Sequence, residues 1–147
     1  MPILTRPIKT TVIALISFSI SGCDRPSDSY KHIKRLPESQ WENYASTLPL
    51  SDRLNLHKEI MTHAGHNPSM TILGSFSKQP FETYQEIVAR LSNGDASPHY
   101  VSVLYEINRS PNFRICSQRN RKLVQRYLWA NATTEVEDRH RPAFYSC

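Results

Sequence analysis

The chain has 147 residues, of which 39% are hydrophobic and 21% are charged, and its formal net charge is +5 at pH 7. This composition is typical of one globular domain and argues against a disordered chain or a repeat array. The positive charge is modest, and a nucleic-acid-binding role would need a stronger basic footprint, so we expect no nucleic-acid partner.

Residues 1–22 have the layout of a secretory signal peptide. Two cations, Arg6 and Lys9, precede an apolar run over residues 11–20. That run is shorter than the roughly 20 apolar residues needed to cross a bilayer, and an apolar run after a basic start is typical of an export signal.

The end of this leader indicates its type. Residues 20–23 read Ile-Ser-Gly-Cys, and a branched aliphatic residue, two small residues and a cysteine resemble the lipobox of bacterial lipoproteins. The resemblance covers only the first 23 residues. It implies cleavage before Cys23, a diacylglycerol on the Cys23 sulfur and usually a fatty acid on the new amine. The alternative is an ordinary secretory signal with a chance cysteine.

Lipid on Cys23 would anchor the mature protein to a membrane. One acyl chain binds only marginally, at about 0.8 kcal/mol per buried methylene, but the implied two or three chains hold a protein essentially permanently. Asp24 follows the cysteine directly, and an aspartate there resembles the inner-membrane retention signal of enterobacteria-like lipoproteins. We therefore expect a lipid-anchored protein on the periplasmic side of a bacterial membrane, with the inner membrane favoured.

Two further cysteines, Cys116 and Cys147, remain once Cys23 carries lipid. An even pair in a compartment that permits oxidation predicts a disulfide bond between them, with two free thiols as the alternative. Closing a loop of about 30 residues would be worth on the order of 3 to 4 kcal/mol in the chain-entropy model, and it would tie the C-terminal tail to the body.

The first half of the mature chain predicts a lipidated tether over residues 23–36, followed by a globular domain over residues 37–147. A helix is expected from Pro37 to Pro49, because apolar residues from Trp41 to Leu48 recur on one helical face. Ser51 can cap a second helix that ends near Gly65. Residues 69–79 fit either a short helix or an irregular buried loop.

The second half contains the clearest helix, which begins at Pro80, carries an apolar stripe and ends at residues 93–94. Residues 99–107 alternate like a strand but also fit a helix, which we favour because no second strand exists to pair with this one. A last helix follows Ser117 or Asn120, and its buried side is formed by Leu123, Val124, Tyr127 and Leu128. The tail from Asn131 is expected to wrap the surface, held by Phe144, Tyr145 and the disulfide.

These elements predict a mainly α fold, a single small domain of four or five short helices with extended connections and a disulfide-tied C-terminal tail. The sequence offers no strong catalytic motif, since it contains neither a Gly-x-Ser-x-Gly elbow nor a cysteine left over as nucleophile. Three histidines, His57, His63 and His66, form the densest group of metal-ligand types. Only His63 and His66 have zinc-like spacing and the His-Glu-x-x-His pattern is missing, so we expect no metal and no cofactor.

The least ordinary stretch runs from residue 108 to residue 134, which contains basic residues and no acid. Arginine is enriched where carboxylates or phosphates are recognised. The predicted partner-binding residues are Arg114, Arg119, Arg121, Lys122 and Arg126. They fit an acidic protein partner or anionic phospholipid headgroups, and the alternative is a solvated face whose cations pair with acids elsewhere in the fold.

Together these features predict a membrane-anchored, non-catalytic protein-binding module. Two roles fit a small periplasmic domain of this kind: an immunity protein against an antibacterial toxin, or an accessory subunit of an envelope complex. The alternative class is a small envelope hydrolase or a metal-binding lipoprotein, which would need the histidines, or a triad from distant segments, to meet in a pocket.

Overall fold

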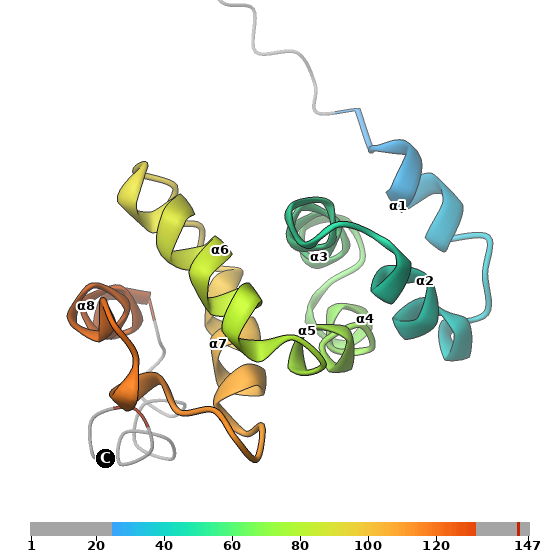
Figure 1. Ribbon diagram of the computed structural model, residues 1–147. Coiled ribbons are helices and arrows are strands. Elements are labelled where there is room, and N and C mark those ends of the chain that lie inside the picture. The colour runs from blue at the N-terminus through green and yellow to red at the C-terminus, as the bar shows by residue number, and fades with distance from the viewer. Residues whose placement is uncertain (1–24, 132–143, 145–147) are drawn as a thin grey trace, which may run out of the picture.

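The computed structural model describes residues 25–131 and Phe144, which form a mainly helical body (Figure 1). No strand occurs among these residues, so the predicted mainly α class is confirmed. Helices α1 to α8 exceed the four or five expected, because several of them are only one or two turns long. The predicted signal peptide, Cys23 and Asp24, and the tail residues Tyr145 and Cys147 lie outside the described residues.

Helix α1 (Asp28–Ile33) lies inside the segment predicted as a tether. The Ser27 side chain accepts a hydrogen bond from the Tyr30 backbone N–H at 3.1 Å, which caps the helix. Tyr30 and Ile33 are both buried. The predicted start of the folded domain at Pro37 is therefore wrong, because α1 contributes two side chains to the core.

Helices α2 to α5 form the remainder of the first half. A single 3-10 turn (Glu38–Gln40) leads into α2 (Trp41–Thr47), and Trp41 anchors it by donating its indole N–H to the Leu36 carbonyl at 3.1 Å. The longest helix is α3 (Leu50–His63), followed by the short helices α4 (His66–Met70) and α5 (Gly74–Ser77). The open question over residues 69–79 thus resolves into short helices.

The second half contains α6 (Pro80–Ser92), α7 (Tyr100–Asn108), a 3-10 turn (Ile115–Ser117) and α8 (Arg121–Asn131). Proline in the first turn begins α6 as predicted. The favoured helix over residues 99–107 is confirmed by α7, and the strand alternative is wrong. Val103, Leu104 and Ile107 of α7 are fully buried.

The helices share one core, with α1 and α8 at opposite ends of the body (Figure 1). Helix α1 packs on α3, whereas α8 packs on α6 and on the 3-10 turn before it. Within the described residues, no helix combines the length and the hydropathy needed to cross a membrane.

A buried arginine joins three helices of the first half. Arg53 of α3 is only 4% exposed. Its Nη1 donates to the Ser75 carbonyl at 2.7 Å, and its Nη2 donates to the carbonyls of Leu48 and Ser46 at 2.9 Å and 3.3 Å. The guanidinium therefore satisfies a buried carbonyl in α5 and two partly buried carbonyls at the end of α2.

One tail residue, Phe144, packs on the second half of the body. Its side chain is 2% exposed, and its ring lies 4.6 Å from the Tyr105 ring of α7 in an edge-to-face arrangement. The Gln125 amide of α8 donates to the Phe144 carbonyl at 2.8 Å. Phe144 itself therefore packs on the body as predicted, while the rest of the predicted tail lies outside the described residues.

Candidate binding surface

Helix α8 presents a buried side and a basic side. Val124, Tyr127 and Leu128 are buried as predicted, whereas Leu123 is only half-buried. The helix follows Asn120, whose φ of 64° lies in the left-handed region that asparagine tolerates better than most residues. This backbone reversal turns the chain into α8 and sets which side chains point outward.

Four of the predicted partner-binding residues lie together on the outer side of α8 and just before it. We define the basic surface as Arg119, Arg121, Lys122 and Arg126, all of which are exposed. None of the four forms an ion pair with any described acid. The expected alternative, in which these cations pair with acids elsewhere in the fold, finds no such pair in the described part of the chain.

The fifth predicted residue, Arg114, forms hydrogen bonds with the backbone of its own chain. Its Nη1 donates to the backbone carbonyls of Asn108, Ser110 and Phe113 at 3.1, 2.9 and 2.8 Å. These carbonyls belong to the end of α7 and the turn after it, where helix geometry leaves acceptors without partners. Because Arg114 is engaged with its own chain, we leave it out of the basic surface.

Two cations of the basic surface, Arg121 and Lys122, lie at the unfavourable end of α8. A helix N-terminus carries a partial positive charge, which favours acids in the first turn and disfavours bases. Arg121 and Lys122 open α8, and the first turn contains no acid. This placement lowers the stability of the free protein, and an anionic group bound at this surface would relieve the repulsion.

Three shallow hollows run along this side of the molecule and share residues. One, with a volume of about 470 Å³, lies against Lys122, Gln125, Arg126 and Trp129. The second follows residues 118–123 and Arg126, and the third is a groove between α6 and residues 118–120. Because neighbouring hollows have residues in common, the basic surface is continuous with the exposed Trp129 on one side and with the groove on the other.

A hydrogen bond from Tyr84 links the groove to the basic surface. The Tyr84 hydroxyl donates to the Arg119 carbonyl at 2.9 Å, and the Tyr84 ring lies 5.6 Å from the Phe113 ring. Burial raises the pKa of Tyr84 to about 12, so the hydroxyl keeps its proton at neutral pH. This bond holds residues 118–120 against α6.

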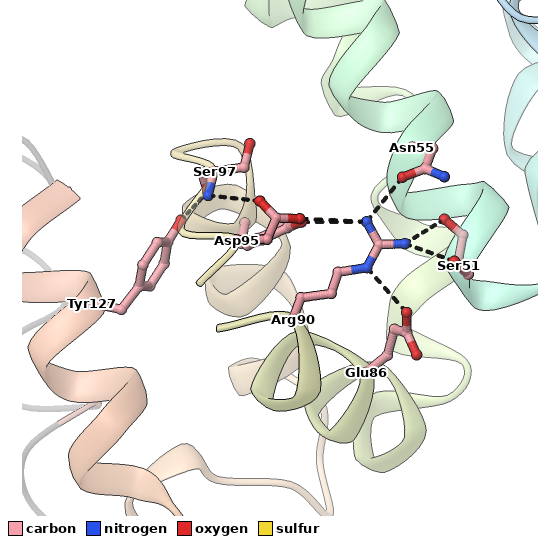
Figure 2. A network of polar contacts seen from close by, with 8 residues as sticks. Ser51, Asn55, Glu86, Arg90, Asp95, Ser97 and Tyr127 are labelled. Carbon is pink, nitrogen blue, oxygen red and sulfur yellow. Dashed lines mark hydrogen bonds and ion pairs between the residues drawn. The ribbon is translucent and has the colours of Figure 1, made fainter. Parts of the chain in front are cut away.

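A polar network also positions α8, which it contacts through the buried Tyr127 (Figure 2). The Tyr127 hydroxyl donates to the Ser97 carbonyl at 2.6 Å, and the Ser97 backbone N–H donates to Asp95 at 3.3 Å. Asp95 lies 4.0 Å from the Arg90 guanidinium of α6. Sequence reasoning missed this network because its members come from distant parts of the chain.

Arg90 carries the network on to α3. Its guanidinium donates to Glu86 at 3.0 Å, to Asn55 at 2.9 Å and to the Ser51 hydroxyl at 2.8 Å, as Figure 2 shows. Burial raises the pKa of Tyr127, which keeps its hydroxyl protonated and able to donate. Helix α8 is therefore held through α6 to the centre of the fold.

The three histidines do not form a common site. His57 is 1% exposed, and burial, reinforced by His99 and His66, lowers its pKa to about 3. Its Nε2 lies 3.4 Å from the Ser102 hydroxyl, but a substrate has no access to an imidazole enclosed in this way. His63 and His66 are exposed, and the described residues contain no group of three or more possible metal ligands.

Comparison of the chain with protein-family models, with curated proteins and with solved structures finds no match in any of the three.

Proposed function

We propose that this protein is a periplasmic lipoprotein whose folded domain binds an acidic partner protein through the basic surface, without catalysing a reaction. The observation that carries the proposal is the group of four exposed cations, Arg119, Arg121, Lys122 and Arg126, that form no ion pair with the described acids. Trp129, which is 61% exposed, borders them. Tryptophan and arginine are the residue types that contribute most to protein interfaces.

The position of the basic surface favours a protein over a lipid partner. Only residues 24–27 separate Cys23 from α1, and such a stretch spans about 15 Å when extended. The backbone N–H of Ser27 also donates to Glu59 of α3 at 2.7 Å. Because α1 and α8 lie at opposite ends (Figure 1), a lipid on Cys23 would attach the protein at the end of the body that is farther from the basic surface.

The proposed anchor has a direct test. Mass spectrometry of the mature chain from its native host should find Cys23 as the first residue, with acyl chains attached. The Cys23→Ser variant should leave the membrane fraction. A mature chain that begins elsewhere, or that carries no lipid, would overturn the periplasmic lipoprotein assignment.

We further propose that Cys116 pairs with Cys147 and so fixes the C-terminal tail. Cys116 is 4% exposed, and Phe144, three residues before Cys147, packs against α7 and α8. Peptide mapping of the unreduced protein should recover the two cysteines in one linked peptide. Recovery of either cysteine as an unmodified thiol would refute the pairing.

We propose two alternative roles for this binding module. It is either an immunity protein that blocks a periplasmic toxin or an accessory subunit of an envelope complex. Both need a partner surface rich in carboxylates. The immunity role predicts a toxin gene immediately upstream and sensitivity to that toxin when the protein is deleted. Deleted cells that stay fully resistant would leave the accessory-subunit role.

The binding proposal is tested by affinity purification of the full-length protein from its native membranes. The triple variant Arg119→Glu, Arg121→Glu, Lys122→Glu should lose most of the partner that the wild type recovers, because like charges then face each other. The matched control changes Lys34, Arg35 and Lys58 to Glu, three exposed residues on the α1 and α3 side. Equal recovery by the two variants would contradict the proposal.

A further inference from the structure

The groove between α6 and residues 118–120 lies directly beside the basic surface but differs from it in chemistry. Its α6 side consists of Phe81, Gln85, Val88 and Ala89, with Tyr84 below them. Phe81 is 50% exposed although it lies on the apolar stripe of α6. An exposed aromatic ring in a hollow is a feature of interfaces, where a partner side chain completes the burial.

A hydrogen bond between the two sides of the groove holds its shape. The hydrogen bond from Tyr84 to the Arg119 carbonyl joins its two sides, and Tyr84 itself is 3% exposed. Its volume of about 480 Å³ lies within the range of roughly 300 to 1,000 Å³ that is typical of ligand-binding hollows. A preformed groove loses little conformational freedom when a partner binds.

The charge at its edge indicates what the groove can accept. Arg119 and Asn120 line both the groove and the hollow that contains Arg121, Lys122 and Arg126. A ligand that binds in the groove and extends past its edge therefore lies over four cations that form no ion pair with described acids. Buried apolar anchors surrounded by a charged rim are the usual anatomy of a protein interface.

We propose that the groove receives a bulky apolar side chain from an acidic segment of the partner protein, while the carboxylates of that segment lie over the basic surface. This inference rests on the proposed function and specifies the partner as an acidic segment with at least one apolar anchor. Charge complementarity gives the segment its position, and the anchor gives it affinity.

The test places a photo-crosslinking amino acid in the full-length protein, in its native membranes, at one position at a time. Gln85 probes the groove, Lys122 probes the basic surface, and Lys58 on α3 is the exposed control. Gln85 and Lys122 should capture the same protein. The Gln85 adduct should map to an apolar residue with acidic neighbours in the partner sequence.

A second set of variants tests whether the groove contributes affinity. Ala89→Trp fills the groove from an exposed position, and Ala64→Trp places the same side chain at an exposed position at the end of α3. Ala89→Trp should lower capture by the Lys122 probe about tenfold, the effect of excluding one buried apolar side chain. Ala64→Trp should leave capture unchanged. Thermal unfolding of both variants shows whether each is folded.

The outcomes separate the two proposals. Capture at Lys122 without capture at Gln85, or with no effect of Ala89→Trp, would overturn the groove inference and leave the basic surface as the interface. A Gln85 adduct that maps to residues 132–143 of this chain, to a second copy or to lipid would also overturn the inference. Capture at neither position above the Lys58 control would contradict the proposed function itself.

Discussion

Two regions of this protein use basic side chains in opposite ways. In the interior and between helices, Arg53, Arg90 and Arg114 each donate several hydrogen bonds to their own chain. On and just before α8, the cations of the basic surface form no ion pair with described acids, and two of them, Arg121 and Lys122, stand at the positive end of the helix. The difference separates arginines that stabilise the fold from basic residues that do not pair with described acids. The second group is therefore the one to test for binding.

The largest effect is expected at Arg53. Arg53→Ala removes the donor from the buried Ser75 carbonyl and from the partly buried carbonyls of Leu48 and Ser46, which should reduce the free energy of unfolding by about 3 kcal/mol. Arg53→Lys should lose less, because one ammonium group can still reach part of the set. Chemical denaturation measures both. If Arg53→Ala lowered the free energy of unfolding by less than the same change at a surface arginine, the role of Arg53 in joining the helices would be contradicted.

Acidification should reveal the buried His57. Its pKa is about 3 in the folded state, against 6.5 when exposed, so the unfolded chain takes up the proton first and stability falls as pH drops through 6.5 toward 3. One such group contributes on the order of 2 kcal/mol of this loss by pH 4.5. The His57→Gln variant should therefore lose less stability than the wild type between pH 7 and pH 4.5. Parallel stability curves would show that His57 is not the group responsible.

A smaller loss is expected at Arg90, which links α6 to α3 from a partly exposed position. Arg90→Ala should lower the free energy of unfolding by about 1 to 2 kcal/mol, because several charge-assisted hydrogen bonds disappear while water replaces some of them. Arg90→Lys should retain the contact with Glu86 and lose the rest. Denaturant titration of the two variants, with the conservative change as control, makes this measurement. Equal stability of the wild type and Arg90→Ala would show that the network in Figure 2 does not support the fold.

The smallest effect should have the opposite sign. Arg121→Glu and Lys122→Glu place acids in the first turn of α8, where each should raise the free energy of unfolding by about 0.3 to 1 kcal/mol. Arg126→Glu, more than one turn into the helix, is the control and should change stability less. The shift in thermal unfolding midpoint at low salt measures this. A clear loss of stability would mean that these cations serve the fold after all.

The sequence was sufficient to predict the longer helices of the second half. In α6 the apolar residues recur over two or more turns and Pro80 marks the beginning, so periodicity identifies this helix. The apolar residues of α7 fit a strand as well as a helix, and the helix was favoured because the sequence offers no second strand to pair with it. The short helix α1 has only Tyr30 and Ile33 as apolar positions in a polar stretch, and six residues are too few to show a helical period. Its burial depends on α3, which local sequence cannot indicate.

The candidate site was predictable only in part. A run of basic residues without acids pointed to Arg119, Arg121, Lys122 and Arg126. The same pattern included Arg114, because a sequence does not show which cation is close to unpaired helix carbonyls. The groove was missed, since Phe81 and Ala89 lie on α6 while residues 118–120 come from a connection about 30 residues later.

The most direct test of the central claim is the affinity of the purified partner for the full-length protein at low and at physiological salt. We predict that the wild type binds more weakly as salt rises, because salt screens the attraction between the basic surface and the carboxylates of the partner. The Arg119→Glu, Arg121→Glu, Lys122→Glu variant should bind at least tenfold more weakly at low salt, about 1.4 kcal/mol, although it remains folded. Equal affinity and equal salt dependence of the two proteins would contradict the account.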